Sequence, residues 1–292
     1  MQWLQLIISA TRETSSSIED ALLDCGAVSV TLEDAADQPI FEPGIGETPL
    51  WDNCQLKALF DANTDTATTG EQLQVQFPQS ALRWEQLEDK DWSQEWKKYF
   101  SPIQCGERLW ICPSWTEPPN AEAINLSLDP GLAFGTGSHP TTHLCLRWLD
   151  SQDLSGQTLI DYGCGTGILG IAALLLGAEK VIAVDNDPQA LLATRDNAQR
   201  NRIDPQRLET YLPEELPENA TCQTMVANIL AAPLIELAPR LTAHTAAGGK
   251  LCLSGLLVHQ IDAVSQPYTD QFVFDPPAIE SEWAQLSARK HS

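Results

Sequence analysis

A buried strand followed by a glycine-rich turn is the strongest chemical signal in the chain. The sequence of residues 159–167 is LIDYGCGTG, an apolar run that ends in Gly163, Gly165 and Gly167 at the start of a predicted helix. Glycine lets the backbone approach a ligand closely, and the first turn of a helix supplies free N–H groups. This segment therefore predicts a cofactor site at the end of the strand.

Two cofactor classes fit the glycine spacing. Gly165, Gly167 and Gly170 match the dinucleotide pattern G-x-G-x-x-G, in which the turn cradles a pyrophosphate. The spacing of Gly163, Gly165 and Gly167 after Asp161 resembles instead motif I of S-adenosylmethionine-dependent methyltransferases. In that motif the turn lies under the amino-acid and ribose parts of the cofactor, and no phosphate is involved. A purely structural glycine turn is the third alternative.

A carboxylate at the end of the next strand supports a nucleoside cofactor. Asp185 follows the apolar run Val181–Val184 and lies 18 residues beyond Gly167. A carboxylate in this place accepts hydrogen bonds from both ribose hydroxyls, and both cofactor classes carry that diol. The position of Asp161, the glycine spacing and the lack of an evident Lys/Tyr or His/Arg catalytic set favour the methyl donor over a nicotinamide cofactor.

Asn228 is a further candidate because it ends a predicted strand, Thr224–Asn228, at the same edge of the sheet. Its amide is a candidate acceptor for the N–H groups of a substrate amine, and the alternative is a helix N-cap. The segment resembles the Asn/Asp-Pro-Pro-aromatic motif of amino-group methyltransferases, but Asn-Ile-Leu-Ala lacks the prolines and the aromatic residue. That departure argues against a planar adenine or glutamine amide as the substrate.

The loop at Asp129–Thr142 is rich in glycine, proline and hydroxyl residues and precedes a helix predicted at Thr142–Leu149. We expect Thr141 or Thr142 to cap this helix and to contact a ligand. His139 is a candidate general base, although a lone histidine before a proline is more often structural. The sequence therefore assigns no catalytic residue, with Asn228 as the candidate amine acceptor.

Composition excludes several classes of protein. The 292 residues include 17 Lys+Arg and 40 Asp+Glu, a formal charge of −23. So acidic a chain repels polyanions, and we expect no binding to duplex DNA. The apolar runs fall far short of the ~18–20 residues that span a bilayer, and no secretory signal is visible. We expect a cytoplasmic protein that does not bind membranes.

The cysteine and histidine spacing predicts no metal site. The eight cysteines form no Cys-x-x-Cys pair, and none accompanies the His-x3-His spacing of His139 and His143. Reduced, mostly buried thiols are the expectation for a cytoplasmic chain. We also expect a monomer.

The chain changes pattern near its middle, which predicts two domains. An α+β, ferredoxin-like domain is expected at 1–88, a helical linker at 89–103, with an amphipathic helix at Asp91–Phe100, and the cofactor-binding domain at 104–292. From Gln157 onward β and α segments alternate, which predicts a Rossmann-like, mostly parallel sheet of seven strands closed by a C-terminal antiparallel hairpin. Within the C-terminal part the predicted helices include 233–244, and the predicted hairpin strands are 271–275 and 282–289.

Several segments together resemble the ribosomal-protein methyltransferase family that modifies the eleventh protein of the large subunit. The matching pieces are EDKDWSQEWKKYF (88–100), GERLWICPSW (106–115), DPGLAFGTGSHPTT (129–142), DYGCGTGILGIAA (161–173), VDNDP (184–188) and VANILA (226–231). FEPGIGETPLW (41–51) is also similar. The resemblance implies a class I fold, S-adenosyl-L-methionine as cofactor, and contacts to it from Thr142, Gly163, Asp185 and Asn228. Gly165 and Gly167 join them through the glycine turn.

The same resemblance implies methylation of the N-terminal α-amine and of lysine side chains on a basic ribosomal protein, which the N-terminal domain recognises. Residues 1–80 carry 13 acidic and two basic residues, a charge of −11, which suits a cationic partner. Plain solubility explains the charge equally well. The rival hypotheses are a nicotinamide-dependent oxidoreductase, a methyltransferase of another protein amine or amide, and a non-enzymatic adaptor that binds a basic protein.

Overall fold

The computed structural model describes residues 3–36, 50–87, 100–129 and 137–292. The chain divides into two compact units, Met1–Lys97 and Lys98–Ser292, each with a hydrophobic core of its own. Most of the predicted linker 89–103, with its helix at 91–100, lies outside the described residues. The matching pieces at 41–51 and 129–142 lie partly outside them as well.

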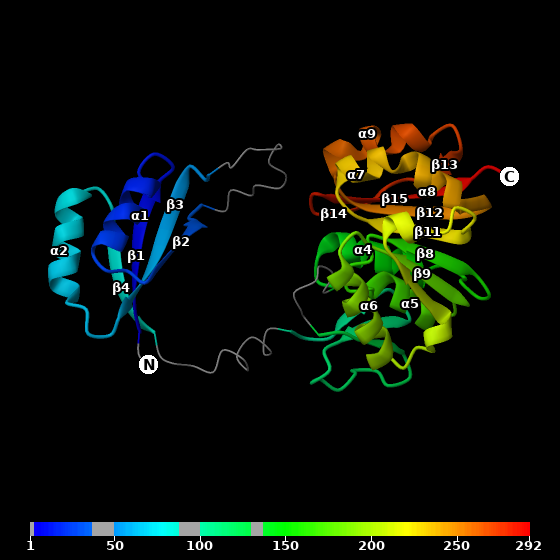
Figure 1. The fold of residues 1–292 in the computed structure, drawn as a ribbon, viewed down its shortest axis with the longest axis horizontal. Helices are drawn as coiled ribbons and strands as arrows, with labels where there is room; N and C mark the ends of the chain where they lie inside the picture. Colours follow the sequence, from blue (N-terminus) through cyan, green and yellow to red (C-terminus); the bar gives the residue numbers. More distant parts are fainter. Residues whose placement is uncertain (1–2, 37–49, 88–99, 130–136) are drawn as a thin grey trace. The chain divides into compact units, whose positions relative to one another are not determined.

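The first unit is a four-stranded antiparallel sheet in the order β2-β3-β1-β4, with two helices on one face (Figure 1). Its elements are β1 (Trp3–Thr11), α1 (Ser15–Asp24), β2 (Ser29–Asp34), β3 (Asn53–Asp61), α2 (Thr66–Gln76) and β4 (Leu82–Leu87). Alternate residues of β3 point inward, so Leu56 and Phe60 meet Ile18 and Leu22 of α1 and Leu73 of α2. This confirms the predicted ferredoxin-like order of elements.

Helix α2 is only weakly amphipathic, and a cap explains where it begins. The carboxylate of Asp65 accepts hydrogen bonds from the backbone N–H groups of Ala67 and Thr68, at 3.1 and 3.2 Å. A hydrogen bond from the Thr68 hydroxyl, together with these two backbone bonds, lowers the pKa of Asp65. An aspartate in the N-cap position thus starts a helix that periodicity alone indicated poorly.

The second unit has a main sheet in the order β10-β9-β8-β11-β12-β15-β13. The five strands from β10 to β12 are parallel, and β15 and β13 are antiparallel to their neighbours. The strands are β8 (Thr158–Tyr162), β9 (Lys180–Val184), β10 (Leu208–Tyr211), β11 (Cys222–Asn228), β12 (Thr245–Leu257), β13 (Phe272–Phe274) and β15 (Trp283–Lys290), and β14 (Ala278–Glu280) also pairs with β15. This confirms the predicted Rossmann-like sheet with its antiparallel C-terminal strands, but the sheet has eight strands instead of the predicted seven, because the unpredicted β14 is added to it.

Helices cover both faces of this sheet (Figure 1). One face holds α4 (Pro140–Asp150), α5 (Ile168–Leu175) and α6 (Pro188–Arg200), and the other holds α7 (Ala231–Glu236), α8 (Ala238–His244) and α9 (Ile261–Ser265). Neighbouring strand residues serve opposite cores: Leu159 and Val181 pack toward the first face, and Ile160 and Ile182 toward the second. Burial on both faces explains why these strands are continuously apolar.

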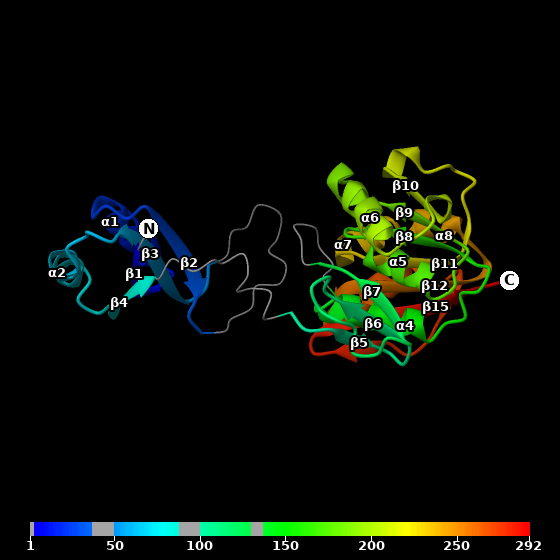
Figure 2. The same cartoon turned by 90° about the horizontal axis from the view of Figure 1, so that it is seen from below.

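Two further details differ from the sequence prediction. The single helix predicted at 233–244 is in fact α7 and α8, because Pro239 cannot continue the hydrogen bonding of a helix interior and instead lies in the first turn of a second helix that begins at Ala238. A small sheet that was not predicted, β5 (Ile103–Cys105), β6 (Leu109–Cys112) and β7 (Ile124–Ser127), packs against α4 and α5 (Figure 2). Its strands have only three or four residues each, which is too short for a clear alternation.

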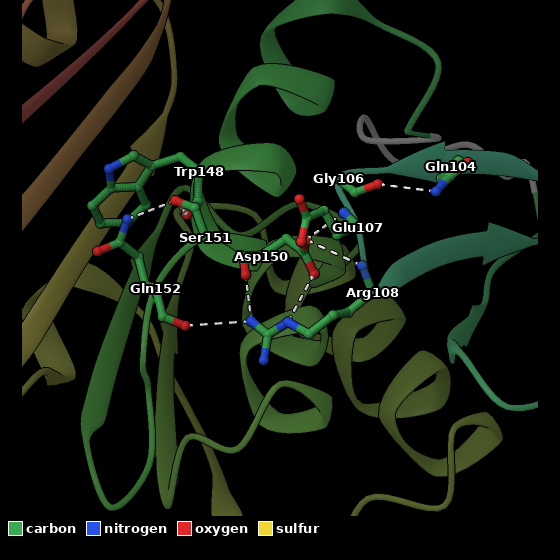
Figure 3. Close-up of polar contacts among 8 residues, drawn as sticks. All are labelled: Gln104, Gly106, Glu107, Arg108, Trp148, Asp150, Ser151 and Gln152. Atoms are coloured by element: carbon green, nitrogen blue, oxygen red, sulfur yellow. Dashed lines mark hydrogen bonds and ion pairs between the residues drawn. The ribbon is translucent and has the colours of Figure 1, made fainter.

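The small sheet is fastened to the end of α4 by a buried carboxylate (Figure 3). Asp150 accepts hydrogen bonds from the backbone N–H groups of Glu107 and Arg108, at 2.7 and 3.2 Å, and pairs with the Arg108 guanidinium at 3.4 Å. Gly106 has φ +94°, and a Cβ there would lie 2.3 Å from a carboxylate oxygen of Asp150. The turn between β5 and β6 is therefore shaped around Asp150, and this contact holds the helix whose first turn carries Thr142.

Candidate active site

The glycine turn after β8 requires glycine at its first and last positions. Gly163, Gly165 and Gly167 all have positive φ, of +80°, +54° and +78°. A Cβ on Gly163 would lie 2.2 Å from Cγ2 of Ile229, and a Cβ on Gly167 would lie 2.7 Å from Cγ2 of Thr194. The turn thus passes directly against its neighbours in a conformation that other residues rarely adopt.

Asp185, directly after β9, is bound to this turn. One carboxylate oxygen accepts a hydrogen bond from the backbone N–H of Gly165 at 2.9 Å, and the other accepts from the N–H of Asp187 at 3.0 Å. A carboxylate has about four acceptor sites, so these two bonds leave lone pairs for a ligand. The structure therefore brings Asp185 and the turn together, as the sequence predicted for a shared site.

Asp161 supports the turn from beneath. Its side chain is buried, and one oxygen accepts from the backbone N–H of Gly170 at 2.9 Å. The other oxygen has no hydrogen-bond partner among the described residues. Burial raises the pKa of Asp161 to about 7, and the nearby charge of Asp185 adds to the shift. A positively charged group above the turn would counter that destabilisation of the carboxylate.

The hydrogen bonds of the turn discriminate between the two cofactor classes. The N–H groups of Gly165 and Gly170 donate to Asp185 and Asp161, and the N–H of Gly167 donates to the carbonyl of Cys164 at 2.8 Å. All three glycine N–H groups of the dinucleotide pattern are therefore used inside the protein, two of them by carboxylates. A pyrophosphate would meet negative charge here, whereas a sulfonium would meet complementary charge.

Asn228 and Thr142 approach each other from β11 and α4. The Asn228 amide nitrogen donates to the Thr142 hydroxyl at 3.3 Å, and Thr142 is buried. The Asn228 amide oxygen is buried and has no hydrogen-bond partner among the described residues. Leu230, not Asn228, occupies the N-cap of α7, so the capping alternative for Asn228 is wrong. The orphaned oxygen instead fits the predicted acceptor for N–H groups of a ligand.

His139, rather than Thr141 or Thr142, caps α4. Its Nδ1 accepts from the backbone N–H of Thr141 at 3.4 Å and lies 2.8 Å from the Thr141 hydroxyl. A neutral imidazole whose Nδ1 accepts carries its proton on Nε2, and burial lowers the pKa of His139, which favours the neutral ring. No ring nitrogen is then left to accept a proton from a substrate, which disfavours the general-base interpretation.

The predicted residues line two adjoining cavities at the carboxyl ends of the parallel strands. The larger has a volume of about 590 Å³ and the smaller about 220 Å³, and both are lined by Gly163, Asp185, Asn186, Asn228 and Ile229. Thr142 and Gly165 line the smaller cavity. Gly167 lines neither and serves instead as the N-cap of α5.

Other residues of the larger cavity escaped the sequence analysis. They are Tyr162, Pro213, Leu230, Pro233, Leu237, Arg240, Gly255 and Trp283, and they line the cavity together with His139 and Thr141, which the sequence analysis had discussed. Gly255, with φ +89°, had a detectable signal, because an isolated glycine inside a strand pattern indicates a bulge or a close approach. A Cβ there would lie 2.2 Å from the carbonyl oxygen of Ile229. Trp283 gave no such signal in the sequence, because only the pairing of its strand within the sheet brings it to the cavity.

A basic residue and a tyrosine with a buried hydroxyl are among the residues that line the larger cavity. The guanidinium of Arg240 lies 5.9 Å from the ring centroid of Tyr162 and donates to the carbonyl of Pro213. The Tyr162 hydroxyl is buried without a hydrogen-bond partner among the described residues, and burial raises its pKa. The rest of the lining is largely apolar, which suits a small organic ligand better than an ion.

Metal ligands and membrane spans are absent from the part of the chain that the structure describes. No group of three or more His, Cys, Asp or Glu side chains in residues 3–36, 50–87, 100–129 and 137–292 is arranged to hold a metal ion. Among the same residues, no helix combines the length and apolar character that crossing a bilayer needs.

Comparison with known proteins agrees with this geometry. Residues 2–291 match the family model described as ribosomal protein L11 methyltransferase (PrmA). The chain is 58% identical over 292 residues to the ribosomal protein L11 methyltransferase of Cellvibrio japonicus, and 52% identical over 291 residues to that of Aeromonas hydrophila, with 99% of each chain covered. The crystal structure of a ribosomal protein L11 methylase from Lactobacillus delbrueckii superposes with a TM-score of 0.60 at 30% identity. The superposition covers 66% of this chain and 100% of the Lactobacillus chain.

Proposed function

The chain belongs to the ribosomal protein L11 methyltransferase family, and from this premise we propose that it transfers methyl groups from S-adenosylmethionine to amino groups of ribosomal protein L11. Relatives that cover nearly the whole chain carry that name. One observation within the site supports it most: the N–H groups of Gly165 in the turn and of Gly170 in α5 donate to carboxylates, which suits a cationic sulfonium nucleoside and disfavours the nicotinamide alternative.

The residues of the site fit this cofactor. Asp185, which still has acceptor capacity, would receive the ribose hydroxyls, and Gly163 and Gly165 leave open space beside the turn. Thr142 and Asn228 would hold the cofactor from the opposite side of the smaller cavity. When bound, S-adenosylmethionine supplies an electrophilic methyl group.

The chain contributes alignment rather than acid–base chemistry in this proposal. The attacking amine must be neutral, and a lysine with a pKa near ~10.4 has to lose a proton first. The orphaned oxygen of Asn228 would accept an N–H of the neutral amine and thereby orient its lone pair. His139 already uses Nδ1 in the cap, so release of the proton to water is the simplest route.

The substrates within L11 form the finer part of the proposal. We expect the N-terminal α-amine and lysine ε-amines to be methylated, with the N-terminal unit recognising the basic protein. The −11 charge of residues 1–80 supports that division of labour. All the residues predicted to bind the cofactor belong to the second unit and are among the described residues.

Mass spectrometry of purified L11 tests the proposal. L11 is incubated with the enzyme and S-adenosylmethionine, and its mass is expected to rise by about 14 Da for each methyl group transferred. Fragmentation of the product then locates the methylated amines. Other basic ribosomal proteins serve as competing substrates in the same reaction. Methylation of a different protein, or of an amide nitrogen, would replace the proposed substrate. No transfer to any protein would favour the adaptor hypothesis.

A further inference from the structure

The larger cavity has an aromatic wall that the mechanism above does not use. Trp283 is the first residue of β15, pairs with Leu257 of β12, and lines the cavity with a half-buried side chain. The His139 ring and the indole are in T-shaped contact, with 4.9 Å between ring centroids and an angle of 68° between the planes. Because His139 is fixed as the cap of α4, the indole is held both by the sheet and by this ring.

This wall and the polar acceptor belong to one cavity. The orphaned amide oxygen of Asn228 and the indole of Trp283 are contributed by β11 and β15, which are both neighbours of β12. Gly255 of β12 has no side chain to fill the space and lies against the backbone of Ile229. A single bound amine can therefore meet a hydrogen-bond acceptor and an aromatic face in the same space.

The two groups suit different stages of repeated methylation. In each transfer the nitrogen lone pair forms an N–C bond as the S–C bond breaks, and the electron pair of the broken bond stays on sulfur. While the product ammonium carries a proton, it must lose it to solvent before the next transfer. A neutral primary amine has two N–H groups, and after two transfers none is left. Asn228 can then no longer orient the nitrogen by accepting from it.

We propose that Trp283 is a specificity-determining residue for the last methyl transfer, because its face binds the dimethylated amine and the quaternary ammonium that forms from it. An aromatic face attracts an alkylated ammonium through cation–π interaction without needing any N–H. Asn228 accordingly serves the early transfers and Trp283 the final one. This inference rests on the proposed amine methylation and on a third transfer to the same nitrogen, which the reaction of the wild type with dimethylated L11 tests.

The test compares two forms of the substrate. Unmodified L11 reports all transfers, whereas reductively methylated L11 carries dimethylamines and reports only the last one. Trp283→Met removes the aromatic face but keeps apolar bulk, and Trp283→Phe keeps a smaller face. We expect Trp283→Met to slow transfer to dimethylated L11 by about tenfold relative to its effect on the first transfer, and Trp283→Phe to slow it less.

Trp110→Met is the matched control, because Trp110 is also half-buried on a strand, in β6, but does not line either cavity. Donor affinity, measured by calorimetry, should stay unchanged in all three variants. Equal slowing of the first and last transfers by Trp283→Met, or no slowing at all, would overturn the assignment. Failure of the wild type to methylate unmodified L11 would instead overturn the proposed function.

A measurement on the wild type keeps the assignment testable if the variants fold poorly. Tetramethylammonium chloride should inhibit transfer to dimethylated L11 competitively, and sodium chloride at the same ionic strength should inhibit it much less. Equal inhibition by the two salts would contradict a binding site for methylated ammonium at Trp283.

Discussion

The carboxylate of Asp185 accepts a hydrogen bond from the backbone N–H of Gly165 at 2.9 Å. This bond joins the end of β9 to the turn after β8, two segments that lie 20 residues apart in the chain. It fixes the shape of the turn, and it places negative charge where a dinucleotide-binding turn would present N–H groups to phosphate.

Removal of the Asp185 carboxylate should weaken binding of S-adenosylmethionine. We expect Asp185→Ala to lower the affinity by about 10- to 100-fold, because it deletes both the acceptor for the ribose and the support of Gly165. Asp185→Asn keeps one acceptor oxygen and should have a smaller effect. Titration calorimetry measures the change, with the exposed Asp196→Ala as control. Unchanged affinity in Asp185→Ala would exclude it from the ribose role.

The space beside Gly163 can be tested with a pair of glycine substitutions. Gly163 and Gly248 both have positive φ, of +80° and +70°, so the backbone conformation alone should make alanine at either position cost roughly 1 kcal/mol of stability. Only at Gly163 would the new Cβ meet another side chain, Ile229, at the wall of both cavities. Gly163→Ala should therefore lose donor binding while Gly248→Ala keeps it. Equal donor affinity in the two variants would show that the turn does not contact the cofactor.

The buried Asp161 should make the stability of the protein depend on pH. Its pKa rises from an ordinary value near 4 to about 7 in the folded chain, so folding favours the protonated form. The folded state therefore loses stability as the pH rises from about 4 to about 7, and the loss then levels off. Asp161→Asn keeps an acceptor for the N–H of Gly170 and does not ionise.

Urea unfolding at several pH values measures this effect as the difference between Asp161→Asn and the wild type without cofactor. The difference in unfolding free energy should grow in favour of the variant between pH 4 and 7, by at least about 1 kcal/mol. A difference that stays constant over this range would mean that Asp161 titrates as an ordinary carboxylate.

The division of labour between the two units predicts the result of a truncation. Removal of residues 1–88 should leave the affinity for S-adenosylmethionine unchanged, because the predicted cofactor residues and their supporting core lie in Lys98–Ser292. Methylation of L11 should fall by roughly tenfold or more, since the acidic unit that attracts the basic protein is gone. Calorimetry and the mass-spectrometric assay measure the two effects. Normal methylation by the truncated chain would show that the N-terminal unit does not recognise the substrate.

Sequence alone determined those features of the protein that a pattern of a few neighbouring residues indicates. Alternating and continuous apolar runs predicted most strands of the two larger sheets, and the glycine spacing with Asp161 and Asp185 predicted where a cofactor would bind. The strand predictions succeed because strand burial depends on short-range sterics and hydrophobicity, whereas the cofactor site stays a prediction. Even so, the cap of α4 was wrongly expected at Thr141 or Thr142, because sequence alone does not show that the imidazole of His139 turns back onto the backbone.

The tertiary structure alone established which polar groups bind each other and which remain available to a ligand. It showed that the N–H groups of Gly165 and Gly170 are occupied by carboxylates, that the Asn228 oxygen is left without a partner among the described residues, and that Trp283 walls the same cavity. These contacts join residues from different strands, and hydrogen-bond satisfaction depends on their positions in three dimensions. Strand order and register are long-range properties, so no local pattern could have placed Trp283 beside His139.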